Sequence, residues 1–127
     1  MALAICLITM LSAAPMALAA EVLQVRSADL LQVGDQNRSY PVRLGCVEVD
    51  ASHTVAATEW LRRALPRRTK VNLRPLGSVD GVLLAQVKLL PGGADLGTGL
   101  VREGLATRLT PPGAPLGCPA SEPPPTP

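Results

Sequence analysis

The chain has 127 residues and a formal net charge of +2, from 12 Lys or Arg and 10 Asp or Glu. This length allows one small domain, and so weak a positive charge does not by itself indicate nucleic-acid binding. With no Phe, one Trp and one Tyr, the core must be built from Val, Leu and Ala, and few rings remain to stack on bases. A dedicated single-strand binder is therefore disfavoured.

The first 20 residues carry no charged side chain, are mostly apolar through Leu11, and end in small residues before Glu21. This pattern predicts a signal peptide over residues 1–20 with a small-x-small cleavage site. An uncleaved anchor is the less favoured alternative, because the apolar run is shorter than the roughly 20 residues that cross a bilayer and Pro15 follows it. We therefore expect an exported protein, periplasmic or extracellular, with no membrane segment after cleavage.

Short runs rich in Val and Leu come next and predict strands at 22–26, 29–33 and 38–47, with a turn at 34–37. A helix should follow, with Asp50 or Ser52 as its N-cap and Pro66 as its end. Apolar residues of that helix recur at helical spacing, so the only tryptophan is assigned to core packing rather than to a ligand platform. The stripe consists of Ala57, Trp60, Leu61, Ala64 and Leu65.

The second half of the domain predicts strands at 70–74 and 82–89, joined by a hairpin turn at 77–81. A short helix capped by Asp95 should end at Gly104. The expected element order is three strands, a helix, two strands and a helix. This order is that of the five-stranded OB-fold barrel, so we expect a mostly β protein with this fold.

This barrel is expected over residues 21–110. The proline-rich tail over 111–127 lacks any periodic pattern, and we expect disorder beyond Cys118.

Two cysteines, Cys46 and Cys118, remain once Cys6 leaves with the signal peptide. An even pair in an oxidising compartment predicts a disulfide. Two free thiols or a metal site are the rival interpretations, although two Cys and the single His53 at unrelated spacings match no zinc motif.

Residues 100–106 read Leu-Val-Arg-Glu-Gly-Leu-Ala, which is similar to the L-V-x-x-G-L-A signature of the staphylococcal nuclease family. The likeness runs from about Val22 to Leu109. Residues 42–51 are similar to that family's strand R-L-x-x-[VI]-D-x-P-E. The resemblance implies an OB-fold barrel and, for an intact site, calcium-dependent hydrolysis of phosphodiesters.

Carried over position by position, the resemblance makes Arg43 the phosphate-clamping arginine and puts Glu48 where the family has a calcium-binding aspartate. Asp29 matches a second calcium ligand. The family's general base is displaced, and only Asp50, one position away, could replace it. The second catalytic arginine has become Val82.

These departures remove groups that the chemistry needs. Losing one preorganised donor costs about 10² to 10³ in rate, and a displaced base costs about 10² to 10⁴ more. The sequence therefore predicts a nuclease-like OB domain that is catalytically degraded and acts as a binding or structural module. The alternative is a calcium-dependent phosphodiesterase of low activity on DNA or RNA, and the only cofactor expected is calcium, if the site is active.

Basic residues are densest around the end of the first predicted helix. They form a candidate surface for nucleic acid or another anion, although cations at a helix C-terminus are also stabilised by the macrodipole without any partner. The oligomeric state is not determined by the sequence. The candidate anion-binding residues are Arg62, Arg63, Arg67, Arg68, Lys70 and Arg74.

Overall fold

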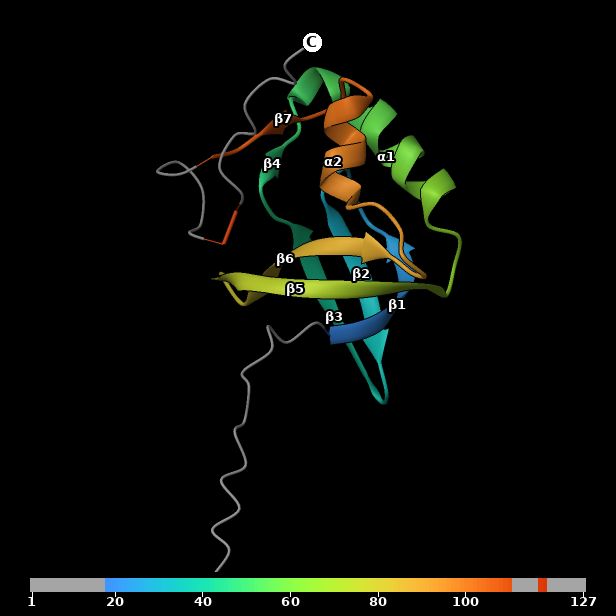
Figure 1. Cartoon of the computed structure of the whole chain (residues 1–127). Coiled ribbons are helices and arrows are strands. Elements are labelled where there is room, and N and C mark those ends of the chain that lie inside the picture. Colours follow the sequence, from blue (N-terminus) through green and yellow to red (C-terminus); the bar gives the residue numbers. More distant parts are fainter. Residues whose placement is uncertain (1–17, 111–116, 119–127) are drawn as a thin grey trace, which may run out of the picture.

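The computed structural model describes residues 18–110 and 117–118. The expected disorder beyond Cys118 and most of the expected signal peptide lie outside the described residues. Five strands form a closed barrel in the order β1-β2-β3-β6-β5 (Figure 1). They are β1 (Leu18–Val25), β2 (Leu30–Asp35), β3 (Arg38–Leu44), β5 (Thr69–Val79) and β6 (Val82–Leu89).

The strand pairing is that of the expected OB-fold barrel. Neighbouring strands run antiparallel except β3 and β6, which are parallel, and pairing of β1 with β5 closes the barrel. The mostly β fold class is therefore confirmed.

Two helices and a small second sheet lie at one end of the barrel (Figure 1). A 3₁₀ turn, η1 (Ala51–His53), leads into α1 (Thr54–Ala64), and α2 (Leu96–Arg102) follows β6. The small sheet pairs β4 (Val47–Glu48) with β7 (Thr107–Arg108). The helices pack through Trp60, whose ring lies directly against Gly99, so the assignment of Trp60 to packing is confirmed.

The core consists of aliphatic side chains that alternate along the strands. β2 buries Leu31 and Val33, and β6 buries Ala85 and Val87, because successive side chains of a strand point to opposite faces. No aromatic residue is fully buried in the described part of the chain, and Tyr40 and Trp60 only pack against the edge of the core. The fully buried residues include Val22, Leu31, Val33, Val42, Val71, Leu73 and Val87.

The third strand is shorter than the expected 38–47. β3 ends at Leu44, the Gly45 N–H donates to the Ala85 carbonyl oxygen at 2.8 Å, and Cys46 has a φ of 67°. A left-handed residue ends the regular ladder. The following residues leave the barrel as β4, so one expected strand is two strands that belong to different sheets.

Other boundaries also differ from the sequence expectations. Asp50 is the N-cap position of η1, and the α-helix begins only after His53, so neither Asp50 nor Ser52 is the N-cap of α1. β5 continues to Val79, which leaves Asp80 and Gly81 as a two-residue hairpin loop with φ values of 52° and 79°. Two residues with positive φ match the right-handed twist of the flanking strands, which explains the tighter hairpin.

At the N-terminal end, β1 begins at Leu18 rather than after residue 20. Leu18 pairs with Leu73, and Ala20 pairs with Val71. Three residues assigned to the signal peptide therefore extend the barrel strand. The cleavage position itself stays a prediction.

Candidate functional site

The expected catalytic arginine and one expected metal ligand lie beside each other at the surface. Asp29 precedes β2, and the β2–β3 register sets its neighbour Leu30 opposite Arg43. Arg43 Nε lies 3.9 Å from Asp29 Oδ2, with the two side chains 47% and 40% exposed. The Asp29 carbonyl oxygen accepts a 2.8 Å hydrogen bond from the Leu44 N–H, which fixes this turn against β3. We call Asp29 and Arg43 the paired face.

Glu48 and Asp50 are held by different elements. Glu48 is exposed in β4, where its backbone pairs with Thr107. Asp50 is exposed at the start of η1, and its Oδ2 lies 3.4 Å from Nδ1 of His53. Among residues 18–110 and 117–118, no group of three or more His, Cys, Asp or Glu side chains is placed to hold a metal ion. The described chain thus does not gather Asp29, Glu48 and Asp50 into one ligand set.

The two cysteines form the expected disulfide. Cys46 is bonded to Cys118 across a sequence separation of 72 residues. The Leu109 N–H also donates to the Cys46 carbonyl oxygen at 2.9 Å, next to the pairing of β4 with β7. The Leu76 side chain lies against both Gly45 and Gly117. The C-terminal part of the described chain is therefore fastened to the segment that follows the paired face.

The six residues of the expected anion-binding cluster lie on α1, on the turn that follows it and on β5. Arg62 and Arg63 lie exposed in the last turn of α1, and Arg67 is exposed in the turn that follows. Arg74 is exposed farther along β5. Arg68 and Lys70, by contrast, line a groove on the barrel surface. Two members of the cluster thus lie in a concave site.

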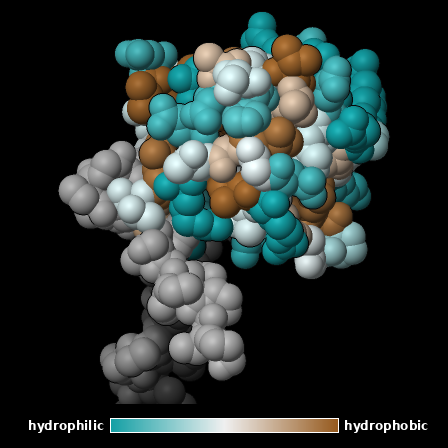
Figure 2. Space-filling model, turned by 90° about the horizontal axis from the view of Figure 1, so that it is seen from above, coloured by the Kyte–Doolittle hydropathy of each residue, from teal (hydrophilic) through white to brown (hydrophobic). Residues whose placement is uncertain are grey.

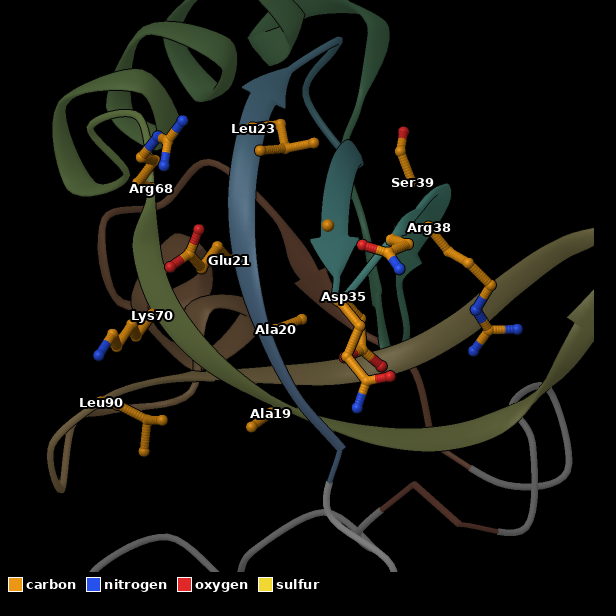
Figure 3. A pocket seen from close by; sticks show the side chains of 13 residues that line it. Ala19, Ala20, Glu21, Leu23, Asp35, Arg38, Ser39, Arg68, Lys70 and Leu90 are labelled. Atoms are coloured by element: carbon orange, nitrogen blue, oxygen red, sulfur yellow. The ribbon is translucent and has the colours of Figure 1, made fainter.

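This groove has a volume of about 680 Å³ and crosses the outward face of β1 (Figure 3). Arg68 and Lys70 lie on one side of β1, and Arg38 and Asp35 from the β2–β3 hairpin lie on the other. Such a volume is typical of small-molecule sites. The full lining is Ala19, Ala20, Glu21, Leu23, Gly34, Asp35, Gln36, Asn37, Arg38, Ser39, Arg68, Lys70 and Leu90.

The groove contains more cations than carboxylates. Arg38, Arg68 and Lys70 face Glu21 and Asp35, which gives the lining a net charge of +1. The ion pairs found in the described part of the chain are Arg43 with Asp29 and His53 with Asp50, so none of the three groove cations has a carboxylate within 4.0 Å there. Unpaired cations in a concave site attract anions.

Tyr40 follows Ser39 of the groove lining in the sequence, and the pKa of its phenol depends on charges in the groove. Burial raises the pKa of the Tyr40 phenol above its ordinary value of 10.0, the Asp35 carboxylate raises this pKa further, and Arg38 lowers it. The phenol therefore senses two charged residues of the groove lining.

The sequence analysis missed Arg38 as a candidate anion-binding residue. Arg38 is 30 positions before Arg68 in the chain, and no local motif connects them. A usable signal exists in the strand order, because β1 pairs with both β2 and β5 and so brings their ends together. Reading that signal requires knowing that the barrel closes.

Apolar side chains do not mark a competing binding surface on the face shown in Figure 2. There, apolar residues are scattered among polar ones rather than gathered. Scattered apolar side chains are normal on protein surfaces. No helix in the described part of the chain is long and apolar enough to cross a membrane.

No protein-family model matches the chain, and no curated protein matches it either. The fold and the geometry of the site define the class of protein, which is a disulfide-bonded OB-fold barrel with a cationic groove.

Proposed function

We propose that this chain is an exported, nuclease-like OB domain that lacks efficient catalysis and binds an anionic partner. The contact between Arg43 and Asp29 carries the proposal. In a working phosphodiesterase, the arginine would face the phosphate and the carboxylate would face a hard cation with oxygen ligands. In this structure, Arg43 and Asp29 instead form an ion pair with each other.

The local sequence supports this interpretation. Val82 occupies the position of the second catalytic arginine in the resembling family, and it has no charge to offer a developing oxyanion. Asp50, the displaced candidate base, lies beside His53 rather than beside Arg43. The scaffold positions therefore persist while the chemical positions have diverged.

Export is supported by the disulfide, because such bonds persist in oxidising compartments. Binding of an anion is supported by the three cations of the groove, which form no ion pair with any residue in the described part of the chain. Nucleic acid and other polyanions are both candidates for this partner. Because exposed charges interact through water, we expect the affinity to fall with rising salt.

One observation favours the alternative, a calcium-dependent phosphodiesterase of low activity. Asp29 and Arg43 are close enough for one ligand to contact both, and an exposed ion pair can open at little cost. If a substrate phosphate drew Arg43 away from Asp29, the carboxylate would be free for a metal ion.

The deciding experiment is hydrolysis of plasmid and single-stranded DNA by the purified, oxidised protein, with calcium and with a chelator. We expect no calcium-dependent cleavage above that of a Glu48→Ala control. Cleavage that requires calcium and disappears in Glu48→Ala would contradict the proposal and support the alternative. An Arg43→Gln variant, which removes the only arginine of the paired face, should likewise leave the result unchanged.

A further inference from the structure

The groove presents its charges at two edges that are separated by an uncharged strip. Arg68 and Lys70 lie at one edge, and Arg38 lies at the other, with the outward face of β1 between them (Figure 3). A single small anion placed at one edge would leave the cation at the other edge unused. A ligand with anionic groups at separated positions can contact both edges.

The lining beside the cations suits hydroxyl groups, with Glu21 on the side of Arg68 and Lys70 and Asp35 on the side of Arg38 (Figure 3). The carboxylates of Glu21 and Asp35 accept hydrogen bonds, the amides of Gln36 and Asn37 donate and accept them, and the apolar side chains are Leu23 and Leu90 with two alanines. No aromatic residue lines the groove. Bases of single-stranded nucleic acid are held mainly by stacking on aromatic rings, so this lining offers them no platform.

From these features we infer that the groove binds an anionic oligosaccharide, a short sugar chain with sulfate or phosphate groups. Its anionic groups contact Arg68 and Lys70 at one edge and Arg38 at the other. Its hydroxyl groups lie against the carboxylates and amides beside these cations. The inference rests on the proposed function of an anion-binding module and names the chemical class of its ligand.

The backbone of the cationic edge is fixed independently of the ligand. Arg68 has a φ of 71°, a conformation that a non-glycine residue adopts at a cost, and its N–H donates to the Val22 carbonyl oxygen at 2.7 Å. Lys70 is held opposite Glu21 by the pairing of β5 with β1. Both cations are thus attached to backbone that closure of the barrel fixes in place.

The charged residues of the lining all follow the expected signal peptide. All five charged residues of the lining lie at position 21 or later, whereas only Ala19 and Ala20 fall within the expected signal peptide. Cleavage after residue 20 would remove part of the apolar lining and leave the charges of both edges.

The test is a calorimetric titration of the full exported protein with a sulfated, heparin-derived hexasaccharide. Two matched probes accompany it: the same hexasaccharide without sulfate, and a thymidine hexanucleotide. We expect binding of the sulfated probe, at least tenfold weaker binding of the hexanucleotide, and no measurable binding of the desulfated probe. Circular dichroism of every variant confirms that it is folded.

Substitutions locate the site. Arg38→Gln and the double variant Arg68→Gln, Lys70→Gln should each weaken binding, by about tenfold for every charge-assisted hydrogen bond that is lost. The matched control is the double variant Arg62→Gln, Arg63→Gln, which removes two exposed arginines of α1 outside the groove. We expect the affinity of this control to equal that of the unchanged protein.

Three results would overturn the inference. If the α1 control weakens binding as much as the groove variants do, the anion binds at the helix end, and the proposed binding function stands without the groove. If the hexanucleotide binds more tightly than the sulfated sugar, the ligand class is wrong. If neither polyanion binds to the folded protein, the anion-binding function fails together with the inference.

Discussion

The paired face and the groove lie on the same barrel and use their charged residues in opposite ways. On the paired face, Arg43 is 3.9 Å from Asp29, so each charge has a partner within the chain. In the groove, three cations and two carboxylates line one hollow, yet no ion pair forms between them within 4.0 Å in the described part of the chain.

This difference indicates which surface is open to a ligand. A ligand at the paired face must compete with an existing ion pair, whereas an anion in the groove meets cations that have no carboxylate partner among the described residues. The two regions are also held in place differently: the segment after Arg43 is fastened by the disulfide, whereas the groove is built on barrel strands and the turns next to them. Three changes can break or sharpen this comparison.

The largest effect is expected from removing the disulfide. The double variant Cys46→Ser, Cys118→Ser opens a link that spans 72 residues, and the chain-entropy relation gives a loss of about 4 kcal/mol in the free energy of unfolding. Urea denaturation of the oxidised protein and the variant measures it. In conditions where the variant stays folded, groove affinity should be unchanged. A loss below about 1 kcal/mol would show that the link contributes little to stability.

A smaller effect is expected from breaking the paired face. Because Arg43 and Asp29 are both well exposed, their coupling in a double-mutant cycle of Arg43→Gln and Asp29→Asn should be about 0.2–1 kcal/mol. It should decrease further as salt is added. The cycle is measured by urea denaturation at two salt concentrations. A coupling well above this range, insensitive to salt, would mean that the pair is structural.

The smallest effect concerns the titration of Tyr40, the only tyrosine in the chain. Its pKa is raised above 10.0 by burial and by Asp35 and is lowered by Arg38, so Arg38→Gln should raise it further. Ultraviolet absorbance of tyrosinate against pH measures the shift, and Arg62→Gln is the control that should leave it unchanged. An unchanged pKa in Arg38→Gln would separate Tyr40 from the charges of the groove.

The titration of Tyr40 also determines how the stability of the fold changes with pH. The folded protein holds the phenol proton of Tyr40 more tightly than the unfolded chain does, because its folded pKa is the higher one. The contribution to stability is therefore fully present below about pH 10 and is lost as the pH rises through the folded pKa.

Much of the fold could be predicted because it depends on local periodicity. Alternating aliphatic residues mark the five barrel strands, the stripe through Ala57 and Leu61 marks α1, and Asp95 accepts a 2.9 Å hydrogen bond from the Thr98 N–H as the expected cap of α2. The break after Leu44 could not be predicted, since it depends on a hydrogen bond from Gly45 to Ala85, some forty positions away.

The sequence by itself determined the barrel class and the aliphatic core, because these follow from side-chain periodicity and composition, and it predicted the pairing of Cys46 with Cys118 once Cys6 was assigned to the signal peptide. Only the tertiary structure decided which charges meet. It gave Arg43 the partner Asp29 and gathered Arg38, Arg68 and Lys70 around one groove. The reason is that sheet register and barrel closure are long-range properties, and they set the neighbours of a charged residue independently of its position in the chain.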